Sequence, residues 1–442
     1  MSRFLVIESE RVPEPSASEA LERQTWAAVR IFAHERCVTR LLDRTTGKET
    51  DTIFIPLFPL ARWMVFNWWS IINETCRWDF LPMPGQQWTP QQRAWVGRHS
   101  LRAAESGLLL PRLCLFGDGR HVCAEWIKDE DDAYPNMPGQ FLYSSRVLLE
   151  RVQVKAALEG FIAKTLSWLS NERDCRVQHL RENWEAIANA DPAEIAFCEA
   201  AGRLGLDPYG SLEGSILDLL EQAGISPQEQ PLFEDVLDAV EPAQSPELWK
   251  WASEVEHSLQ LSPAPRLEVP PLPSTLRAAQ AGYAMARRWR DQVGLAPGEP
   301  MQGVAGVGKK MGIDLGWEIR NHLAAGNVRA AVGWREGRKP VLVGPKPEQE
   351  PARRFLEARG LYHAAYACTA GPRLVTDARS WDQQCSRAFA AELLVPQEVV
   401  QTQIPDGLDP EETERQMAKI ADRFQVSVYA VMHQLENGRR SY

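Results

Sequence analysis

The segment "SPAPRLEVPPLP", residues 262–273, has five prolines among its twelve residues. Proline fixes φ and removes a backbone donor, so this segment cannot lie inside a helix or in the middle of a sheet. Proline-rich segments of this kind are semi-rigid spacers between domains. We therefore predict that the chain is divided here, and that residues 274–442 form a C-terminal domain.

Length and composition are those of a protein with several ordinary globular domains. The chain has 442 residues, of which 44% are hydrophobic and 24% charged; at about 100–200 residues per domain this indicates two to four domains. No run approaches the roughly 18–20 apolar residues of a membrane span, and the N-terminus lacks the apolar core of a signal peptide. We expect a cytoplasmic protein with no membrane partner.

The eight cysteines are scattered, and none forms a C-x-x-C pair. This spacing argues against a zinc ribbon and against a thioredoxin-like motif. In the cytosol we expect free thiols that are mostly small buried hydrophobes.

Charge is unevenly distributed along the chain. The net charge of −10 disfavours a protein that binds nucleic acid over its whole surface. Residues 171–260 hold 19 acidic and 5 basic side chains, whereas residues 275–339 hold 11 basic and 5 acidic ones. Solvated faces are the ordinary explanation. The alternative is docking between these segments or with a charged partner.

The N-terminal part is predicted to be a mixed α+β domain of residues 1–143. β-Branched and aromatic runs in 26–44 and 50–57 flank a turn, and a second hairpin is expected at 112–126. Between these hairpins, residues 59–74 fit a helix whose apolar stripe indicates core. The stripe consists of Trp63, Phe66, Trp69 and Ile72.

Residues 144–261 are predicted to be a helical, acidic middle region. A long amphipathic helix is expected at 144–171, and shorter helices after it. One of these ends at Gly205 and resembles half of a helix-turn-helix, but its acidity makes phosphate contact a poor explanation. The predicted fold class is therefore α+β and multidomain.

After the proline-rich segment, the patterns alternate between helix and strand. Ser274 is a candidate N-cap of the first helix, and Gly294 a candidate stop. The expected order is helix 274–295, a short helix, strand 312–317, hairpin strands 328–334 and 339–344, helix 353–371, extended segment 372–378, helix 381–401, and a closing helix pair in 412–440.

The segment "GVAGVGKK", residues 303–310, matches the G-x-x-x-x-G-K spacing of a phosphate-binding loop. A functional loop needs a strand before it, a helix after it and a hydroxyl for magnesium, but Lys310 occupies the hydroxyl position. We predict a short helix here and no nucleotide site.

Five segments in this order resemble the ImmA/IrrE family of metallo-endopeptidases, over residues 275–440. "RAFAAELLVPQEVV" is the strongest, since it is close to the family's "FAAELLMP" signature. The other segments are "AMARRWRDQVGL", "GVGKKMGIDL", "GWREGRKPVLVGP" and "IADRFQVSVYAVMHQLENG". The resemblance implies a zincin-like C-terminal domain.

The family's active helix carries H-E-x-x-H after an Arg-Phe pair, which Arg354 and Phe355 match here. In that motif two histidines four residues apart share one zinc ion, and the glutamate deprotonates the zinc-bound water. This chain has Arg359 at the first histidine position and Gly360 at the glutamate position; only His363 remains.

The resemblance also implies a carboxylate ligand shortly before "FAAELL", where this chain has Gln383 and Cys385. A guanidinium repels a dication and cannot lose its proton to become a ligand, and glycine cannot act as a base. We therefore expect no zinc hydrolysis by the family mechanism and no cofactor, with residual groove residues His363, Cys385, Gln383 and Asp382.

Three interpretations of the remaining residues stay open. His363, Cys385 and Cys368 could form a remodelled structural zinc site, since zinc accepts both Cys and His. Cys385 and His363 could instead be a thiol nucleophile and its base. The simplest interpretation is that His363 is a packed, hydrogen-bonded core residue.

These alternatives lead to three functional hypotheses. The first is a pseudopeptidase that binds a protein, either a helix-turn-helix repressor or an effector subunit, in a bacterial phage-defence, mobile-element or stress-response system. The second is a divergent active metallopeptidase, with Glu357, Asp382 and Glu392 as candidate carboxylates; Glu357 should point away from the metal position. The third is a DNA-binding regulator that uses the closing helix pair, which is not favoured by the acidic balance.

Overall fold

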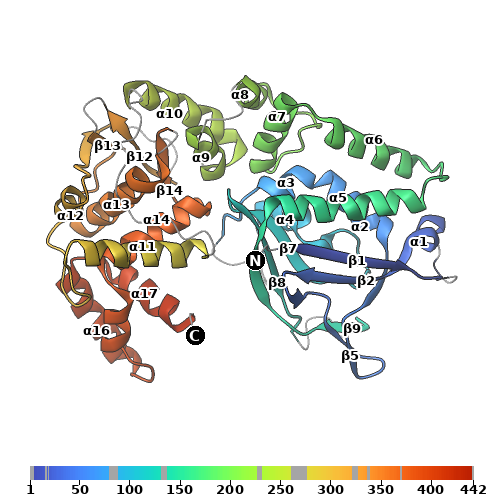
Figure 1. Cartoon of the computed structure of the whole chain (residues 1–442), viewed down its shortest axis with the longest axis horizontal. Coiled ribbons are helices and arrows are strands. Elements are labelled where there is room, and N and C mark those ends of the chain that lie inside the picture. The colour runs from blue at the N-terminus through green and yellow to red at the C-terminus, as the bar shows by residue number, and fades with distance from the viewer. Residues whose placement is uncertain are drawn as a thin grey trace. The chain divides into compact units, whose positions relative to one another are not determined.

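The computed structural model describes residues 4–14, 17, 19–78, 88–130, 137–225, 231–259, 276–320, 327–335, 339–368 and 371–440. The chain forms two compact units, Met1–Pro227 and Gln228–Tyr442, each with helices and small sheets (Figure 1). A mixed α and β architecture in more than one unit is therefore observed, as predicted.

The boundary between the units differs from the predicted one. Residues 262–273 lie outside the described residues. Helices α9 (Pro231–Ala239) and α10 (Ser245–Leu259), predicted as the end of the helical middle region, belong to the second unit. The reason is packing, because their apolar side chains cover one face of that unit's sheet.

Three small sheets form the strand part of the first unit. The hairpin predicted at 112–126 is present, and Gly119 takes a positive φ of 89° in its turn. One sheet contains β1 (Leu5–Arg11), β2 (Trp26–Ala33), β3 (Arg36–Cys37) and β6 (Ile53–Pro56); another contains β4 (Leu41–Asp43), β5 (Lys48–Thr50) and β9 (Gly139–Phe141); the third contains β7 (Arg112–Gly117), β8 (His121–Ile127) and β10 (Ser145–Glu150). The segment 26–57 is more divided than predicted, because its strands belong to two sheets: β2 pairs with β6, whereas β4 and β5 flank the expected turn.

The helix predicted at 59–74 is two helices, because Asn67 leaves helical geometry with φ −113° and ψ 12°. Phe66, the last residue of α2, is 39% exposed, whereas Trp63, Trp69 and Ile72 are buried. Phe66 was thus wrongly predicted as core.

The long helix predicted from residue 144 begins later. Ser145–Glu150 is strand β10, paired antiparallel with β8, and the helix starts at Arg151. Tertiary pairing with β8 outweighs the local helical pattern at these residues. The helices of this unit are α1 (Ala20–Thr25), α2 (Leu57–Phe66), α3 (Trp68–Asn73), α4 (Pro90–His99), α5 (Arg151–Trp168), α6 (Cys175–Asn189), α7 (Pro192–Arg203) and α8 (Gly214–Ile225), with a 3₁₀ turn at Leu101–Ala103.

A four-stranded sheet is the centre of the second unit, in the order β11–β13–β12–β14. β11 pairs parallel with β13, and the other pairs are antiparallel. Side chains of β12 and β13 alternate between two hydrophobic clusters, one shared with α11, α13 and α14 and the other with α9 and α10. The sheet is therefore covered on both faces. Its strands are β11 (Gly316–Ile319), β12 (Val328–Arg335), β13 (Lys339–Gly344) and β14 (Arg373–Thr376).

The remaining helices follow the predicted order with shifted ends. Ser274 lies outside the described residues, and Gly294 has the positive φ expected of a helix stop. The helix predicted at 381–401 is interrupted before Pro396, which cannot continue it. The helices are α11 (Ala278–Gln292), α12 (Val304–Lys310), α13 (Glu350–Tyr362), a π-helical segment (His363–Ala367), α14 (Trp381–Leu394), α15 (Gln397–Gln403), α16 (Pro410–Phe424) and α17 (Val428–Arg440), with a 3₁₀ turn at Pro242–Gln244.

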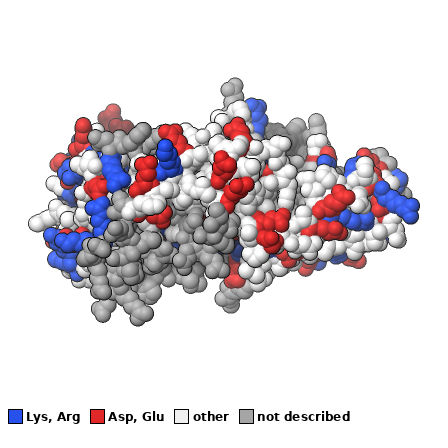
Figure 2. Space-filling model, turned by 90° about the horizontal axis from the view of Figure 1, so that it is seen from above, with Lys and Arg blue, Asp and Glu red and all other residues white. Residues whose placement is uncertain are grey.

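Acidic and basic side chains are interspersed on the face of the molecule shown in Figure 2. Within the described part of the chain, no helix is both long and apolar enough to cross a membrane.

Candidate functional site

Arg359 fills the position where the resemblance would place a zinc-binding histidine. It lies on α13 and is only 3% exposed. Its Nη2 donates to the carbonyl of Thr376 at 2.5 Å and to Oε1 of Gln383 at 2.8 Å, and its Nε donates to Oγ of Ser386 at 3.1 Å. The guanidinium is thus bound by oxygens of β14 and α14.

The surroundings of this guanidinium are unusual for a cation. Burial lowers the pKa of Arg359 well below its ordinary value, nearby Arg387 lowers it further, and Asp377 opposes both. The closest carboxylate contact, to Oδ1 of Asp377, is 3.9 Å long. Neutral oxygens therefore provide most of the hydrogen bonds, and the rigid fork of arginine matches their positions.

Gln383, predicted as a groove residue, is fully buried and bonded to the neighbouring strand. Its Oε1 accepts from the backbone N–H of Thr376 at 2.9 Å, and its Nε2 donates to the carbonyl of Leu374 at 2.6 Å. The Gln383 carboxamide therefore accepts from one backbone N–H of β14 and donates to one backbone C=O, as a neighbouring strand would.

β14 lies at one edge of its sheet, so these bonds determine whether it can accept a peptide. The N–H of Leu374 donates to Asp235 at 2.9 Å, and the carbonyl of Thr376 also accepts from Arg387 at 3.3 Å. The N–H and C=O groups of Leu374 and Thr376 are thus all engaged by side chains. In this conformation β14 does not offer those groups to an added strand.

Asp382, the fourth predicted groove residue, belongs to a buried ion-pair network. Arg373 donates to both carboxylate oxygens of Asp235, at 2.7 and 2.8 Å, and to Oδ2 of Asp382 at 3.2 Å. Tyr362 donates to Oδ1 of Asp382 at 3.2 Å. Burial alone lowers the pKa of Arg373, but Asp235 and Asp382 outweigh it and raise this pKa well above its ordinary value.

His363 is buried beside this network and starts the π-helical segment. Neither ring nitrogen meets hydrogen-bond geometry with a partner in the described part of the chain, although Gln383 is close enough to raise its pKa slightly. Burial, followed by Arg373 and Arg359, lowers the pKa of His363 well below 6.5. The ring is therefore neutral. The burial expected of a core histidine is observed, but the expected hydrogen bond is not.

The three candidate zinc ligands do not point to a common centre. The thiol of Cys385 donates to the carbonyl of Ala278 in α11 at 2.9 Å, and that of Cys368 donates to Val332 in β12 at 3.4 Å. Burial raises the pKa of Cys368 to about 12, which disfavours the thiolate that zinc requires. Among the described residues, no three His, Cys, Asp or Glu side chains are placed to hold a metal ion.

Gly360 is explained by packing against the sheet. A Cβ atom at this position would lie 2.9 Å from Cδ1 of Leu342 on β13. Helix α13 therefore approaches the sheet closely at Gly360, and a larger side chain there, such as the glutamate of the family motif, would require Leu342 to shift.

The other two candidate carboxylates, Glu392 and Glu357, have contacts typical of structural residues. Glu392 is 1% exposed and accepts from Arg287 at 2.7 Å, from the N–H of Gln397 at 2.9 Å and from Gln434 at 3.0 Å. It thereby joins four helices. Burial raises the pKa of Glu357, and the basic groups that oppose this shift are Arg353, Lys346 and Arg354. In the described part of the chain, neither Glu392 nor Glu357 bonds to the groups that surround Arg359.

The closing helix pair has a short turn in which Gln425 is left-handed, with a φ of 54°. Arg354 bonds to this Gln425 side chain and to the carbonyl of Met301, which ties the turn to the rest of the unit. Val428, the first residue of α17, is 46% exposed, whereas Val426 of the turn is buried in the core. Tyr429 is 63% exposed.

The phosphate-loop match is helical. Val304–Lys310 forms α12, and the Lys310 ammonium donates to the carbonyl of Val293 at 3.3 Å. In a functional phosphate loop these residues form an open turn between a strand and a helix. Here they are themselves helical, so the segment does not form that turn.

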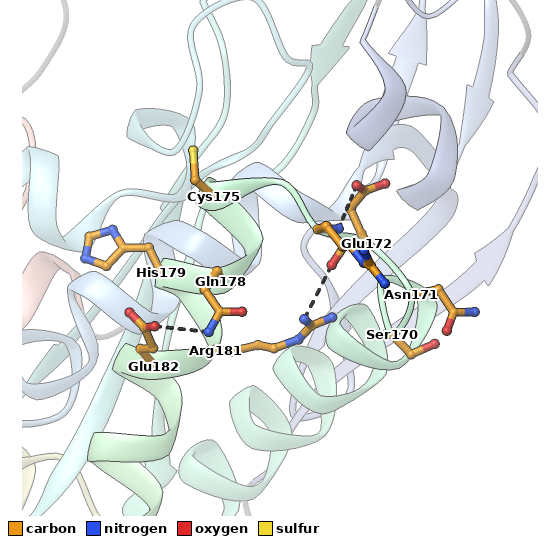
Figure 3. A pocket seen from close by; sticks show the side chains of 9 residues that line it. Ser170, Asn171, Glu172, Cys175, Gln178, His179, Arg181 and Glu182 are labelled. Atoms are coloured by element: carbon orange, nitrogen blue, oxygen red, sulfur yellow. Dashed lines mark hydrogen bonds between the residues drawn. The ribbon is translucent and has the colours of Figure 1, made fainter.

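An open pocket of about 780 Å³ lies in the first unit, at the turn between α5 and α6 (Figure 3). Arg181 crosses it to the carbonyls of Leu169 and Glu172, and Gln178 donates to Glu182 at 3.0 Å. The residues that line it are Ser170, Asn171, Glu172, Arg173, Cys175, Gln178, His179, Arg181 and Glu182. It includes none of the residues predicted from the sequence.

Cys175 and His179 of this pocket do not form a catalytic pair. In Figure 3 the Cys175 sulfur and the His179 ring point in different directions. The His179 ring packs instead against Phe66, with centroids 5.3 Å apart.

Comparison with known proteins provides no relative: no protein-family profile matches this chain, and no curated protein matches it significantly. The resemblance to the ImmA/IrrE family therefore depends on the five segments and the Arg-Phe pair named above.

Sequence reasoning did not find the residues that close the network, namely Asp235, Arg373, Thr376 and Ser386. Arg373 and Thr376 lie in a segment predicted only as extended. Asp235 is 138 residues from Arg373, and no local pattern signals a contact over that separation.

Proposed function

We propose that this protein is a catalytically inactive relative of the ImmA/IrrE peptidases. As a pseudopeptidase, it would act by protein binding, as a regulator, sensor or subunit in a bacterial phage-defence, mobile-element or stress-response system. The five similar segments support the relationship. The single observation that supports inactivity is the guanidinium of Arg359, buried and bonded where the motif requires a zinc ligand.

The surroundings of Arg359 support the same proposal. A zinc peptidase needs a water on the metal and a base beside it. Here the position of the base is Gly360, whose hydrogen faces Leu342, and the position of a third ligand is Gln383, whose amide is bonded to β14. The polar groups at these positions bond within the protein, so they are neither free to coordinate a metal ion nor open to solvent.

The first test measures the metal content and peptidase activity of the purified full-length protein. We expect less than one tightly bound zinc per chain and no cleavage of a casein or helix-turn-helix repressor probe. One zinc per chain, together with cleavage that a chelator abolishes, would establish the divergent metallopeptidase instead.

A second test captures partners. Tagged full-length protein, isolated from its native host after crosslinking, should enrich one protein reproducibly. We expect this protein to remain intact after incubation with purified chain. Cleavage of the captured protein would contradict a purely binding role.

DNA binding by the closing helix pair is a second candidate, favoured by its short turn with left-handed Gln425 and by the exposed side chains at the start of α17. A gel-shift assay over a range of salt concentrations tests it. Contact with phosphates should weaken as salt increases, and Tyr429→Ala should reduce a specific interaction through α17. An unchanged mobility at low salt would remove this candidate.

A further inference from the structure

The side chains that close β14 come from two different parts of the second unit. Gln383, Arg359 and Arg387 belong to α13 and α14. The bond to the N–H of Leu374 comes instead from Asp235 on α9, a segment that precedes the peptidase-like region. α9 therefore lies on this edge of the sheet as an element separate from α13 and α14.

The contacts of Asp235 are those of a carboxylate bound in a receptor site. Its two oxygens accept from Nε and Nη2 of Arg373 at 2.7 and 2.8 Å, and one of them also accepts from the N–H of Leu374 at 2.9 Å. A bidentate guanidinium with a backbone N–H is a strong, geometrically specific way to bind a carboxylate. Asp235 is 2% exposed, so the site is desolvated around it.

An apolar surface continues from this carboxylate site. Leu232 and Val236, on the same helix, pack in one cluster with sheet side chains. The sheet residues of that cluster are Val328, Ala331, Val341, Val343 and Leu374. The occupant is thus recognised by an acidic side chain together with two apolar side chains, Leu232 and Val236, that lie one turn apart on one helical face.

We propose that α9 occupies, within the same chain, a docking site for an acidic amphipathic helix of a partner protein. The partner's carboxylate would replace Asp235 on Arg373 and Leu374, and its apolar side chains would replace Leu232 and Val236 on the sheet. Exchange between the two helices would then regulate partner binding. This inference rests on the proposed binding role, to which it adds the partner's chemistry and the site where the partner binds.

The buried ion pair contributes more to the specificity of this contact than to its stability. A buried ion pair adds little net stability, because desolvation offsets most of the attraction, but it discriminates strongly against a partner that lacks the charge. A nine-residue helix such as α9 is marginal by itself, so its order depends on this contact surface. A covalently attached helix also has a high effective concentration, so a free helix competes only when the attached one is weakened.

The experiment uses full-length protein and a fluorescein-labelled peptide of residues 231–259, the sequence of α9 and α10. We expect weak binding to the wild-type protein, because its own α9 occupies the site. Asp235→Asn in the protein should increase affinity for the peptide by about tenfold. Adding Arg373→Gln should remove this gain, because the receptor guanidinium is then lost.

Two controls separate docking from unfolding. A peptide with Asn in place of Asp235 should bind the Asp235→Asn protein at least about tenfold more weakly than the original peptide, whereas an unfolded protein would bind both alike through apolar surface. Glu247→Gln, at an exposed acid on α10, should leave peptide binding at the wild-type value.

If Asp235→Asn does not fold, Val236→Ala loosens α9 without changing the carboxylate site. It should also increase affinity for the original peptide, and that gain should disappear with Arg373→Gln. Equal binding of the two peptides, or no gain in either variant, would overturn the docking site. Zinc-dependent hydrolysis of any probe would overturn the proposed function instead, which keeps the two failures distinguishable.

Discussion

Arg359 connects two elements of a folded core through one buried side chain. The cationic fork binds three oxygens that belong to two elements, Thr376 on β14 and Gln383 and Ser386 on α14. A zinc ion connects its ligands in the same general way, but it also activates water. The guanidinium holds the elements together without that chemistry.

Replacing Arg359 should therefore reduce stability. Arg359→Ala leaves the buried oxygens of Thr376 and Gln383 without this donor and creates a cavity, and we expect a loss of about 3 kcal/mol or more in the free energy of unfolding. Urea denaturation measures it. Arg359→Lys is the matched control, which keeps the charge but loses the fork, and we expect an intermediate loss. A change below about 0.5 kcal/mol in the alanine variant would show that the network contributes no stability.

His363 should make stability depend on pH. Its pKa is lowered well below 6.5 in the folded state, so the unfolded chain binds a proton that the folded chain does not. Stability is then fully present above pH 6.5 and is lost as pH falls, by about 1.4 kcal/mol per pH unit from this group.

Urea denaturation of wild-type protein and His363→Leu, between about pH 7 and pH 5, tests this dependence. We expect the wild-type protein to lose more stability than the variant over this range, since the leucine cannot take up a proton. Parallel pH profiles for the two proteins would mean that His363 is not held neutral.

At the scale of elements, the contact between α13 and the sheet depends on the missing side chain of Gly360. Glycine usually weakens a helix by about 1 kcal/mol relative to alanine. Because Gly360 has no Cβ, the helix can lie against Leu342. A Cβ at this position would be only 2.9 Å from that side chain. Close packing outweighs helix propensity at this residue.

Gly360→Ala should consequently destabilise the protein by about 1–3 kcal/mol, although alanine is the better helix former. Leu342→Ala alone should also destabilise it, by about 2–5 kcal/mol. The double variant should be more stable than the sum of the two losses predicts, because the smaller side chain makes room for the new methyl group. A double-mutant cycle in urea measures this coupling, and strict additivity would exclude the contact.

For the whole molecule, α9 and α10 determine whether the sheet of the second unit is covered on both faces. These helices cover the sheet face opposite α11, α13 and α14. A fragment of residues 228–442 retains this cover. A fragment of residues 274–442, the domain predicted from the sequence, would expose the apolar side chains beneath it.

We expect the 228–442 fragment to be monomeric and the 274–442 fragment to aggregate or to bind a hydrophobic dye, because the uncovered sheet face is apolar. Size-exclusion chromatography and dye fluorescence distinguish the two. A monomeric 274–442 fragment that binds no dye would show that α9 and α10 are dispensable for this core.

The hairpins, most helices and their order were predictable from the sequence, because side-chain periodicity and turn residues such as Gly119 act locally. The sequence also shows that Arg359 and Gly360 stand where the similar motif has a histidine and a glutamate. The break at Asn67 and strand β10 were not predictable in this way, since local patterns there favoured one continuous helix and tertiary contacts decided otherwise.

Only the tertiary structure decided what these residues contact. The sequence shows an arginine and a glutamine, but not that Gln383 bonds β14 or that Arg359 completes the same edge. It gives no sign of the contact between Asp235 and Arg373, which are 138 residues apart. Hydrogen-bond partners and buried charges are selected by proximity in space, and folding alone brings such distant side chains together.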